Sequence, residues 1–487
     1  MKKKKKTIRL KNKLGQRGAV LKKRSRQLVI QTKRRQKRPS FFISHGRLFD
    51  RLAIVGTGLI GSSIARAVRH ENLTNSIVAT ARTSATRQRI LELNLADKVV
   101  DTNAAAVEGA DLVIVCVPVG AYGSVAKEIG PHLIPGAIVS DVGSVKRSVV
   151  RDMAPYIPKY AHFIPAHPVA GTENSGPDAG FAELFQERWC ILTPTENANK
   201  AATKKLATFW EKLGANVQFM TPDHHDLVLA VTSHIPHLIA YTILCTAAEI
   251  SETLKTNLLR GVDKPFRQFT RIAASDPTMW RDIFLANNDA VRAMLFTFTE
   301  DLSKLTRAMR DNNKEFLLSH FRHVQALRNR VAHLNQAAFT FDEDRSAIDS
   351  HGAFRRELAV TVHLPRLIAY AIVGTADELR QVTQSEVLRF SAGGFRDFTS
   401  IAASDPNFWG DSILENKDAV LDILGRFNED LFKLTDAMRF GKSEFLYDFF
   451  QRMREIRRET VEKGNEDQTA TPSHEDDLYL RGPYSAD

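Results

Sequence analysis

The sequence predicts an α/β fold in which a doubly wound parallel sheet is followed by an all-helical domain that is duplicated. From Arg51 onward, short apolar runs alternate with amphipathic stretches, which is typical of parallel strands joined by helices. From about residue 223, apolar residues recur at helical spacing instead. The segment VTSHIPHLIAY then returns as VTVHLPRLIAY, so that Pro365 answers Pro236 at an offset of 365 − 236 = 129 residues. This ungapped return indicates an internal duplication.

The first strand, turn and helix predict a dinucleotide-binding site. RLAIV is an apolar strand, GTGLIG a glycine-rich turn and SSIARAVRH an amphipathic helix. The first glycine permits the tight turn, the second lets a pyrophosphate approach the backbone, and the third allows close packing of helix on strand. The cofactor-binding residues expected here are Gly56, Gly58, Leu59, Ile60 and Gly61. The fold class is therefore Rossmann-type, with NAD or NADP as cofactor.

The end of the second strand bears on the choice between these cofactors. An acid is expected there for NAD, because it accepts a hydrogen bond from the ribose 2′-hydroxyl. The sequence has Ala81, Arg82 and Thr83 instead, and a cation beside hydroxyl groups suits a 2′-phosphate. NADP is therefore favoured; the alternative is that Arg82 is a solvated surface residue and that either cofactor is used. Val117 and Pro118, at the end of LVIVCVP, are expected to line the cofactor path.

Positive charge is concentrated at the N-terminus. The 487-residue chain has a formal net charge of +12, but residues 1–49 hold 19 lysines and arginines and no acid, so the remainder carries 12 − 19 = −7. This stretch lacks a sustained apolar period, and we expect a disordered basic arm. A dispensable tail is the favoured interpretation, and nucleic-acid binding through phosphate contacts is the less favoured one.

Membrane insertion, a disulfide framework and a thiolate metal site are not expected. No apolar run reaches the roughly 18 residues of a membrane-spanning helix, and no early hydrophobic segment indicates export. The three cysteines, Cys116, Cys190 and Cys245, form no CxxC pair, which argues against a disulfide framework and a thiolate metal site. These features predict a cytoplasmic protein.

The stretch from Ser140 to Gly176 is expected to hold the chemistry. Two predicted strands bring polar side chains to it: Asp141, Ser144 and Lys146 after the strand at Ala137–Val139, and His167 from the second strand. Ligands of open α/β sheets bind at the carboxyl ends of the strands. A histidine of near-neutral pKa can accept the proton of a substrate hydroxyl while hydride leaves the same carbon. An isolated histidine is more often a buried, hydrogen-bonded one, so the surrounding motifs decide the assignment of His167.

Four motifs are decisive: DVGSVK, HPVAGTENSG, SHIPHLIAY and FTRIAASDPTMWRD. Together they resemble the prephenate and arogenate dehydrogenases of tyrosine biosynthesis, over about Arg51 to Arg310. The resemblance implies that His167 is the catalytic base and that Ser144 lies between the substrate hydroxyl and the nicotinamide. It also implies that His237 and Arg271 bind the substrate. The further candidates are Ser233, Thr172, Glu173 and Lys146 for the substrate and Asp141 for the cofactor.

The implied reaction is the NAD(P)-dependent oxidative decarboxylation of prephenate to 4-hydroxyphenylpyruvate, or of arogenate to tyrosine. One alternative is another two-domain dehydrogenase, of the β-hydroxyacid or imine-reductase kind, whose usual lysine has no matching motif here. A second is a nucleotide-binding regulator without catalysis, against which the joint presence of the site residues argues. A metal at His224–His225 or His234–His237 is rejected, because no acid or thiol completes a ligand set.

The second copy of the helical domain is expected to be structural and catalytically silent. Three polar side chains of the first copy change in it: Ser233 to Val362, His237 to Arg366 and Arg271 to Ser400. We expect a homodimer, or an intramolecular pseudo-dimer in which the second copy takes the partner's place. The alternative is that GGFRDF, at Gly393–Phe398, completes the substrate site. The expected boundaries are residues 1–49 (basic arm), 50–222 (nucleotide-binding domain), 223–338 (helical domain), 339–356 (linker), 357–464 (second copy) and 465–487 (disordered tail).

Overall fold

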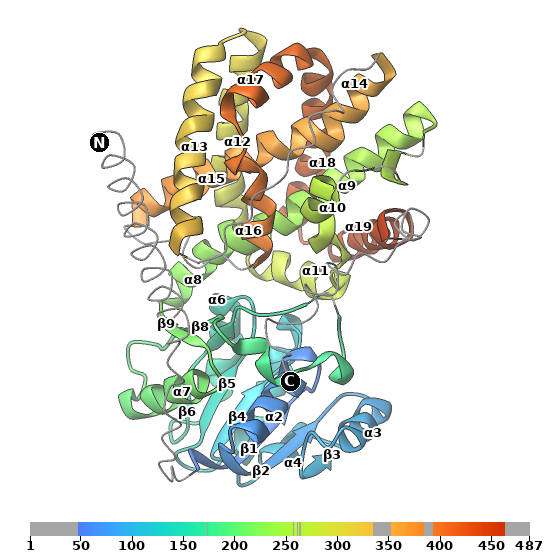
Figure 1. Ribbon diagram of the computed structural model, residues 1–487. Helices are drawn as coiled ribbons and strands as arrows, with labels where there is room; N and C mark the ends of the chain where they lie inside the picture. The colour runs from blue at the N-terminus through green and yellow to red at the C-terminus, as the bar shows by residue number, and fades with distance from the viewer. Residues whose placement is uncertain are drawn as a thin grey trace, which may run out of the picture. The chain divides into compact units, whose positions relative to one another are not determined.

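The computed structural model describes residues 47–172, 174–256, 258–260, 262, 264–334, 352–383 and 393–462, and Figure 1 labels its helices and strands. The predicted basic arm, up to residue 46, and the predicted tail lie outside these residues. Most of the predicted linker lies outside them too. Its last residues belong to a helix, α14 (Gly352–Leu358).

A six-stranded parallel sheet forms the centre of the nucleotide-binding half. Its strands are β1 (Phe49–Val55), β2 (Thr74–Thr80), β3 (Lys98–Val100), β4 (Leu112–Val115), β5 (Ile138–Asp141) and β6 (His162–Phe163). Their order is β3-β2-β1-β4-β5-β6, with parallel pairing throughout. This is the strand order of a doubly wound dinucleotide-binding fold, and it confirms the predicted fold class.

Helices cover both faces of this sheet, which explains why its strands are continuous apolar runs. They are α2 (Leu59–His70), α3 (Ser84–Glu92), α4 (Asn103–Val107), α5 (Tyr122–Ile129) and α6 (Lys146–Met153). Side chains of a strand alternate between its two faces. In β1, Leu52 and Ile54 join one buried apolar cluster, whereas Ala53 and Val55 join the other. Because β1, β4 and β5 are parallel neighbours, their carboxyl ends meet at one edge of the sheet, where the glycine-rich turn lies.

A second, three-stranded sheet follows, and the sequence did not predict its separation from the first. It consists of β7 (Ala166–Pro168), β8 (Trp189–Leu192) and β9 (Asn216–Phe219), with α7 (Lys200–Lys212) between the last two. Strand β7 runs antiparallel to β8, and β8 runs parallel to β9. The backbone N–H of Ala166 donates to the Asp141 carboxylate at 3.2 Å, which joins β7 to the end of β5. His167 thus reaches the edge of the main sheet from a different sheet.

The helical domain occurs twice, as predicted. The first copy contains α8 (Pro222–Leu229), a π-helix (Ala230–His234), α9 (Ile235–Leu254), α10 (Lys264–Thr270), α11 (Pro277–Ala286), α12 (Asn288–Arg310) and α13 (Lys314–Leu334). The second contains α14, a π-helix (Ala359–His363), α15 (Leu364–Thr383), α16 (Gly393–Thr399), α17 (Pro406–Glu415), α18 (Lys417–Arg439) and α19 (Ser443–Ile456). From the π-helix onward, each element begins 129 residues after its counterpart.

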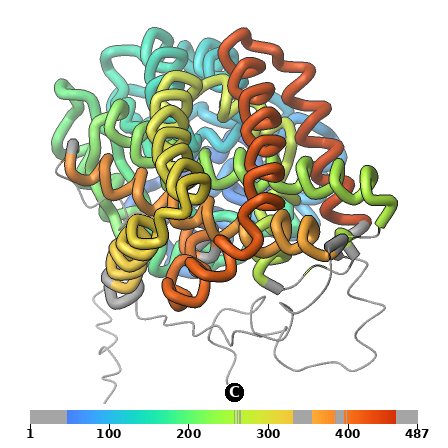
Figure 2. Tube along the Cα trace, turned by 90° about the horizontal axis from the view of Figure 1, so that it is seen from above, coloured from blue at the N-terminus to red at the C-terminus, as the bar shows by residue number. Residues whose placement is uncertain are grey.

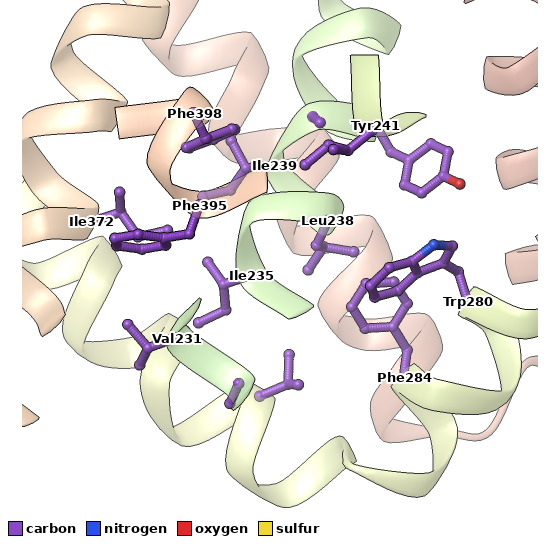
Figure 3. Close-up of a cluster of buried hydrophobic side chains, with 14 of the residues drawn as sticks. Val231, Ile235, Leu238, Ile239, Tyr241, Trp280, Phe284, Ile372, Phe395 and Phe398 are labelled. Carbon is purple, nitrogen blue, oxygen red and sulfur yellow. The ribbon is translucent and has the colours of Figure 1, made fainter. Parts of the chain in front are cut away.

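The two copies pack on each other reciprocally. Helix α9 contacts α18 as α15 contacts α12, and α11 contacts α19 as α17 contacts α13. Figure 2 shows the result, with helices of the first copy (green to yellow) interleaved with those of the second (orange to red). Ile372, Phe395 and Phe398 of the second copy lie in the same apolar cluster as Ile235 and Ile239 of the first (Figure 3). Neither copy therefore has a separate core.

Individual contacts show the same twofold pattern. Phe269 stacks on Phe398, its own counterpart, with ring centroids 3.7 Å apart. Polar contacts also occur in matching pairs: Thr246 lies 3.0 Å from Asp430, and Thr375 lies 3.4 Å from Asp301. In a twofold interface, residue i of one side meets residue j of the other, and j meets i. These contacts have that form within one chain.

Two helical segments have the length and apolar character of a membrane span: Pro222–Leu254 and Phe354–Gln381. The expectation that no apolar run reaches this length was therefore wrong. In each segment, 83% of the apolar window is buried within the protein. These segments contain α9 and α15, which lie in the interface between the copies, so core packing explains their apolar character.

Candidate active site

His167 is the first residue of a buried hydrogen-bonded chain. Its side chain lies in β7 and the residue is 8% exposed. Nδ1 of His167 lies 2.8 Å from Nε2 of His225, and Nδ1 of His225 lies 2.8 Å from Oδ1 of Asp226. His225 and Asp226 are buried residues of α8. The chain therefore connects the first helix of the helical domain to the edge of the sheet.

The group at the end of this chain determines where its hydrogens lie. The ionised Asp226 carboxylate only accepts, so Nδ1 of His225 carries a hydrogen. Nε2 of a neutral His225 is then an acceptor, and Nδ1 of His167 donates to it. This leaves Nε2 of His167 without a hydrogen. That atom can accept a proton from a ligand.

The surroundings favour the neutral form of both imidazoles. Burial lowers the pKa of His167 well below its usual range, and the neighbouring His225 and Lys146 lower it further, since a second positive charge beside them is unfavourable. Burial also lowers the pKa of His225. Both rings are therefore neutral at physiological pH, and His167 has the protonation state that a general base requires.

Asp226 also connects the helical domain to the nucleotide-binding half. The backbone N–H groups of Lys146 and Arg147, in the first turn of α6, donate to its carboxylate at 2.7 and 3.0 Å. Burial raises the pKa of Asp226, and these two hydrogen bonds oppose that change. A carboxylate at the start of a helix is favoured by the unpaired N–H groups and the helix dipole. Asp226 thus caps α6 and orients His225 at the same time.

The sequence alone does not identify His225 or Asp226 as site residues. The HHD segment that contains them suggests only a metal site, for which no complete ligand set is evident. The available signal was the acid directly after the histidine, at the point where the helical domain begins. Their role depends on a contact with His167, 58 residues earlier in the chain, which no local pattern records.

Lys146, expected to bind the substrate, and Asp141, expected to bind the cofactor, form a buried ion pair with each other. Both side chains are 0% exposed. Nζ of Lys146 also donates to the Ala166 carbonyl at 2.6 Å, and the Gly143 N–H donates to Asp141 at 2.8 Å. Burial raises the pKa of Asp141 and lowers that of Lys146, while their mutual attraction opposes both changes. The pair fixes β7 against β5 and so positions His167.

His237 lies on α9 and is held by two contacts. Its ring stacks on Trp280 of α11, with centroids 3.7 Å apart and an interplanar angle of 24°. Its Nδ1 lies 2.8 Å from the Ser233 carbonyl, which only accepts, so Nδ1 carries the hydrogen and Nε2 is an acceptor. Burial lowers the pKa of His237 to about 3, and the nearby charge of Arg271 contributes to this change. The structure therefore brings Arg271 and a neutral His237 close together.

The remaining substrate candidates differ in their surroundings. Ser144 is half-buried in the turn between β5 and α6. Ser233 is half-buried in the π-helix, and the contact it makes to His237 is through its carbonyl. Thr172 is exposed, and its hydroxyl accepts from the Asn174 N–H at 3.3 Å. Glu173 lies outside the described residues.

The glycine-rich turn fits a dinucleotide. Gly56 has a φ of +92°, and a Cβ there would lie 2.6 Å from the Cys116 carbonyl oxygen. A Cβ on Gly61 would lie 2.4 Å from the Gly56 carbonyl oxygen, so α2 packs tightly on this turn. A Cβ on Gly58 would meet nothing within 4 Å. Open space therefore lies over the N-terminus of α2, where the unpaired N–H groups favour a phosphate.

The neighbouring cofactor candidates lie around this turn and at the ends of the adjacent strands. Leu59 and Ile60 are half-buried in the first turn of α2, Val117 is half-buried, and Pro118 is exposed beyond β4. Past β2, Arg82 is exposed. Thr83 caps α3, since its hydroxyl accepts from the Thr86 N–H at 3.1 Å.

The second copy has a different arrangement where the first has His237. The guanidinium of Arg366 lies 3.4 Å from the ring centroid of Trp409, the counterpart of Trp280. Arg366 is only 6% exposed. A cation thus takes the place of the neutral imidazole in the second copy.

One group of potential metal ligands occurs among the described residues, and it lies away from this site. Cys245, Glu249 and Asp430 have ligand atoms within 4.8 Å of one another. They lie between the two copies, and neither histidine pair of the first copy belongs to the group. The carboxylate of Asp430 also accepts from Lys433 at 2.9 Å and from Thr246 at 3.0 Å.

Two family models match both halves of the chain. The model for the nucleotide-binding domain of prephenate dehydrogenase matches residues 64–219. The model for the dimerization domain of prephenate dehydrogenase matches residues 221–323 and 354–455. The two ranges of the second match correspond to the two helical copies.

Individual relatives agree with these models. Cyclohexadienyl dehydrogenase of Zymomonas mobilis is 42% identical over 281 residues, which cover 58% of this chain and 96% of the relative. Prephenate dehydrogenase of Bacillus subtilis is 30% identical over 281 residues, covering 58% of this chain and 76% of the relative. A crystal structure of prephenate dehydrogenase from Aquifex aeolicus, in complex with hydroxyphenyl propionate and NAD+, is 32% identical, with a TM-score of 0.55, and is matched over 58% of this chain and 98% of that one. The chain therefore belongs to the prephenate dehydrogenase family of oxidoreductases.

Proposed function

We propose that this protein oxidises prephenate or arogenate with loss of carbon dioxide, using NADP or NAD. The observation that carries the proposal is the chain of Asp226, His225 and His167, which leaves an unprotonated Nε2 on His167. The relatives named as cyclohexadienyl and prephenate dehydrogenases support the substrate class. The complex of the Aquifex aeolicus enzyme with hydroxyphenyl propionate and NAD+ supports a ring-bearing carboxylic acid and a nicotinamide dinucleotide as the two ligands.

In this mechanism, Nε2 of His167 takes the proton of the ring hydroxyl. The carbon that bears the hydroxyl gives up hydride and becomes a carbonyl carbon. The ring carboxylate then leaves as carbon dioxide, and the electrons of the broken bond complete an aromatic ring. His167 returns its proton to the ring oxygen, which becomes the phenol. Because aromatisation favours the product strongly, the protein mainly supplies orientation and a base.

The buried partners of His167 support this role. The imidazolium that forms on His167 keeps its Nδ1–H bonded to His225, whose other nitrogen is bonded to Asp226. The negative charge of Asp226 stabilises this cation without direct contact. The same bonds hold the ring in one tautomer and one orientation, as a carboxylate does for the histidine of a serine protease.

Substrate binding is assigned to the residues near His237. The guanidinium of Arg271 is proposed to bind a substrate carboxylate, since a planar fork of donors matches two oxygens. Nε2 of His237 is proposed to accept a hydrogen bond from the substrate, and Ser144 to contact its ring hydroxyl. We also propose that Thr172, Glu173 and Ser233 contact the substrate.

The cofactor is proposed to bind across the glycine-rich turn. When bound, a nicotinamide dinucleotide supplies the hydride acceptor. Gly56, Gly58 and Gly61 would hold its pyrophosphate at the start of α2. Arg82 and Thr83 would meet a 2′-phosphate, and on this ground we propose a preference for NADP. Val117 and Pro118 would border the cofactor path.

The helical copies are proposed to form an intramolecular pseudo-dimer. The matched contacts of Phe269 with Phe398, and of the two threonines with the two aspartates, support this arrangement. A second copy then occupies the place that a partner subunit would take through a dimerization domain. A cytoplasmic location is proposed with it, as expected for a biosynthetic enzyme.

Steady-state assays of the purified full chain with both acids and both cofactors test the proposal. Turnover is expected with at least one acid, with release of carbon dioxide and formation of a phenol. The value of kcat/KM is expected to be higher with NADP, and Arg82→Ala is expected to narrow the difference. No turnover with either acid would overturn the proposed reaction, whereas equal efficiency with both cofactors would overturn only the cofactor preference.

A further inference from the structure

An aromatic chain that starts in the second copy ends at His237 of the first. His237 stacks on Trp280, and Trp280 lies 5.4 Å from Phe284. Phe284 in turn lies 5.4 Å from Phe450 of α19. Phe450 also packs on Tyr241, one turn beyond His237 on α9, with ring centroids 4.6 Å apart. Figure 3 shows Trp280 and Phe284 gathered beside Tyr241.

Helix α11, which carries two of these rings, has contacts on two sides. On one side, the guanidinium of Arg281 lies 5.9 Å from the ring of Tyr447 of α19. On the other side, Asp282 approaches Gly120 so closely that a Cβ on that glycine would lie 3.3 Å from its carboxylate oxygen. Gly120 belongs to the short helix Val119–Ala121, directly after the predicted cofactor-lining end of β4. Helix α11 is therefore held between the second copy and the nucleotide-binding half.

We propose that α19 is the positioning element of the substrate site, and that Phe450 keeps Trp280 stacked on His237. This inference rests on the proposed function. Phe450 touches neither substrate nor cofactor and acts through Phe284 and Trp280. The Ser233 carbonyl fixes the tautomer of His237, and the stacked indole fixes the plane of its ring. The second copy is thus silent in the chemistry but not in substrate binding.

The chain contains a matched control for this role. Phe321 of α13 is the counterpart of Phe450, and it packs on Tyr370, the counterpart of Tyr241, at 4.0 Å. Both phenylalanines are 0% exposed. Ile413 stands where the first copy has Phe284, so the aromatic chain is interrupted in the second copy. Removing Phe321 therefore removes the same kind of packing without a connection to His237.

The test compares Phe450→Ala with Phe321→Ala in the full chain, together with Phe450→Leu and Phe321→Leu. The thermal midpoint, kcat and the KM values for acid and cofactor are measured for all four. Both alanine variants are expected to lower the thermal midpoint, since each opens a cavity in the same core. Only Phe450→Ala is expected to raise the KM of the acid, on the order of 10-fold, because the stacked pair is no longer held in place. The kcat of Phe450→Ala is expected to stay within about 2-fold of that of the unmodified protein, and its KM for the cofactor is expected to be unchanged.

The outcomes separate this inference from the proposed function. If Phe450→Ala and Phe321→Ala raise the KM of the acid equally, or if only kcat falls, the positioning role of Phe450 is overturned. If an alanine variant does not fold, the KM of the acid is compared between Phe450→Leu and Phe321→Leu instead. A smaller rise in this KM is expected, and for Phe450→Leu alone. Absence of turnover in the unmodified protein would contradict the proposed function. In that case, calorimetric binding of the acid to the two variants decides the positioning role.

Discussion

The two copies of the helical domain have a common scaffold and differ where the first copy meets the nucleotide-binding half. Asn287 lies 3.0 Å from Nδ1 of His234, and in the second copy Asn416 lies 3.2 Å from Nδ1 of His363. The same asparagines donate to the backbone carbonyls of residues 226 and 355, at 2.9 and 2.8 Å. The residue at this position is Asp226 in the first copy and Arg355 in the second. The backbone contact is therefore retained while the side chain has changed.

The residues that pack the two copies together are retained in both, whereas the side chain proposed to support the reaction occurs only in the first. The helices and the core that the two copies share are built from apolar residues and a buried asparagine–histidine contact in each copy. Asp226 has a further task in the first copy, because its carboxylate accepts from the first turn of α6 and from His225, which contacts His167. Duplication alone did not preserve the side chains that serve the reaction.

The comparison predicts that all turnover depends on the first copy and on His167. His167→Asn is expected to fold and to bind cofactor, but to lose on the order of 10²–10⁴ in kcat, since the base is gone. Initial rates and cofactor titrations measure the two effects separately. Near-normal turnover between pH 6 and 9 would remove His167 from the mechanism.

Removal of the second copy tests the comparison most directly. A chain that ends at residue 338 leaves uncovered the faces of α9, α11 and α12 that contact α15, α18 and α19. Such apolar faces pair when exposed, so the truncated protein is expected to self-associate and to remain active. Size-exclusion chromatography with light scattering measures the association.

In this dimer, Phe321 of the partner chain would take the place of Phe450, and Phe321→Ala would then raise the KM of the acid. A stable, active monomer would contradict the pseudo-dimer.

Asp226→Asn removes the charge that distinguishes the first copy at this position. It is expected to lower kcat on the order of 10-fold to 10²-fold. The tautomer of His225 is then no longer fixed, and the imidazolium that forms on His167 has no negative charge nearby to stabilise it. Asp223→Asn is the control, since that acid lies on the same helix with an exposed side chain. The pH profile of kcat/KM should shift for Asp226→Asn alone. Equal effects of the two substitutions would indicate loss of helix stability instead.

The smallest expected effect is one that the two copies have in common. Burial lowers the pKa of His234 and of His363 to about 3 in each case. The unfolded chain binds a proton at each of these histidines below about pH 6.5, whereas the folded protein does not. The free energy of unfolding should therefore be constant with respect to these groups above pH 6.5 and fall as the pH decreases below it. Urea unfolding between pH 7.5 and 5 measures this slope, and His363→Asn should reduce it without changing kcat; an unchanged slope would show that His363 is protonated in the folded protein.

The sequence predicts those features that depend on local pattern. The glycine-rich turn, the order of strands and helices and the 129-residue duplication all follow from spacing and composition. Strand β7 has only three residues, and its pairing with β8 depends on a chain segment more than twenty residues later. For this reason the sequence does not predict the second sheet. It also does not predict that Lys146 is buried beneath this sheet, where its Nζ donates to the Ala166 carbonyl.

The site was predicted less completely, again for a physical reason. The role of His225 depends on a contact with His167, and the role of Phe450 on an interface between two copies. Neither contact leaves a periodic or compositional signal, because each joins residues that are distant in the chain. The apolar character of α9 can be read from the sequence, but only the packing of the two copies shows that this helix lies in an interface.

The pairing of Phe269 with Phe398 has a consequence for how this protein can vary. In an assembly of identical subunits, one codon specifies both rings of such a contact, so every substitution appears on both sides of the axis at once. Here two codons specify them, and each side can change alone. This independence allows Phe284 to stand beside Trp280 while Ile413 occupies the matching position across the axis. Tethering also makes the pairing insensitive to dilution, because the effective concentration of one copy beside the other is fixed by the chain that joins them.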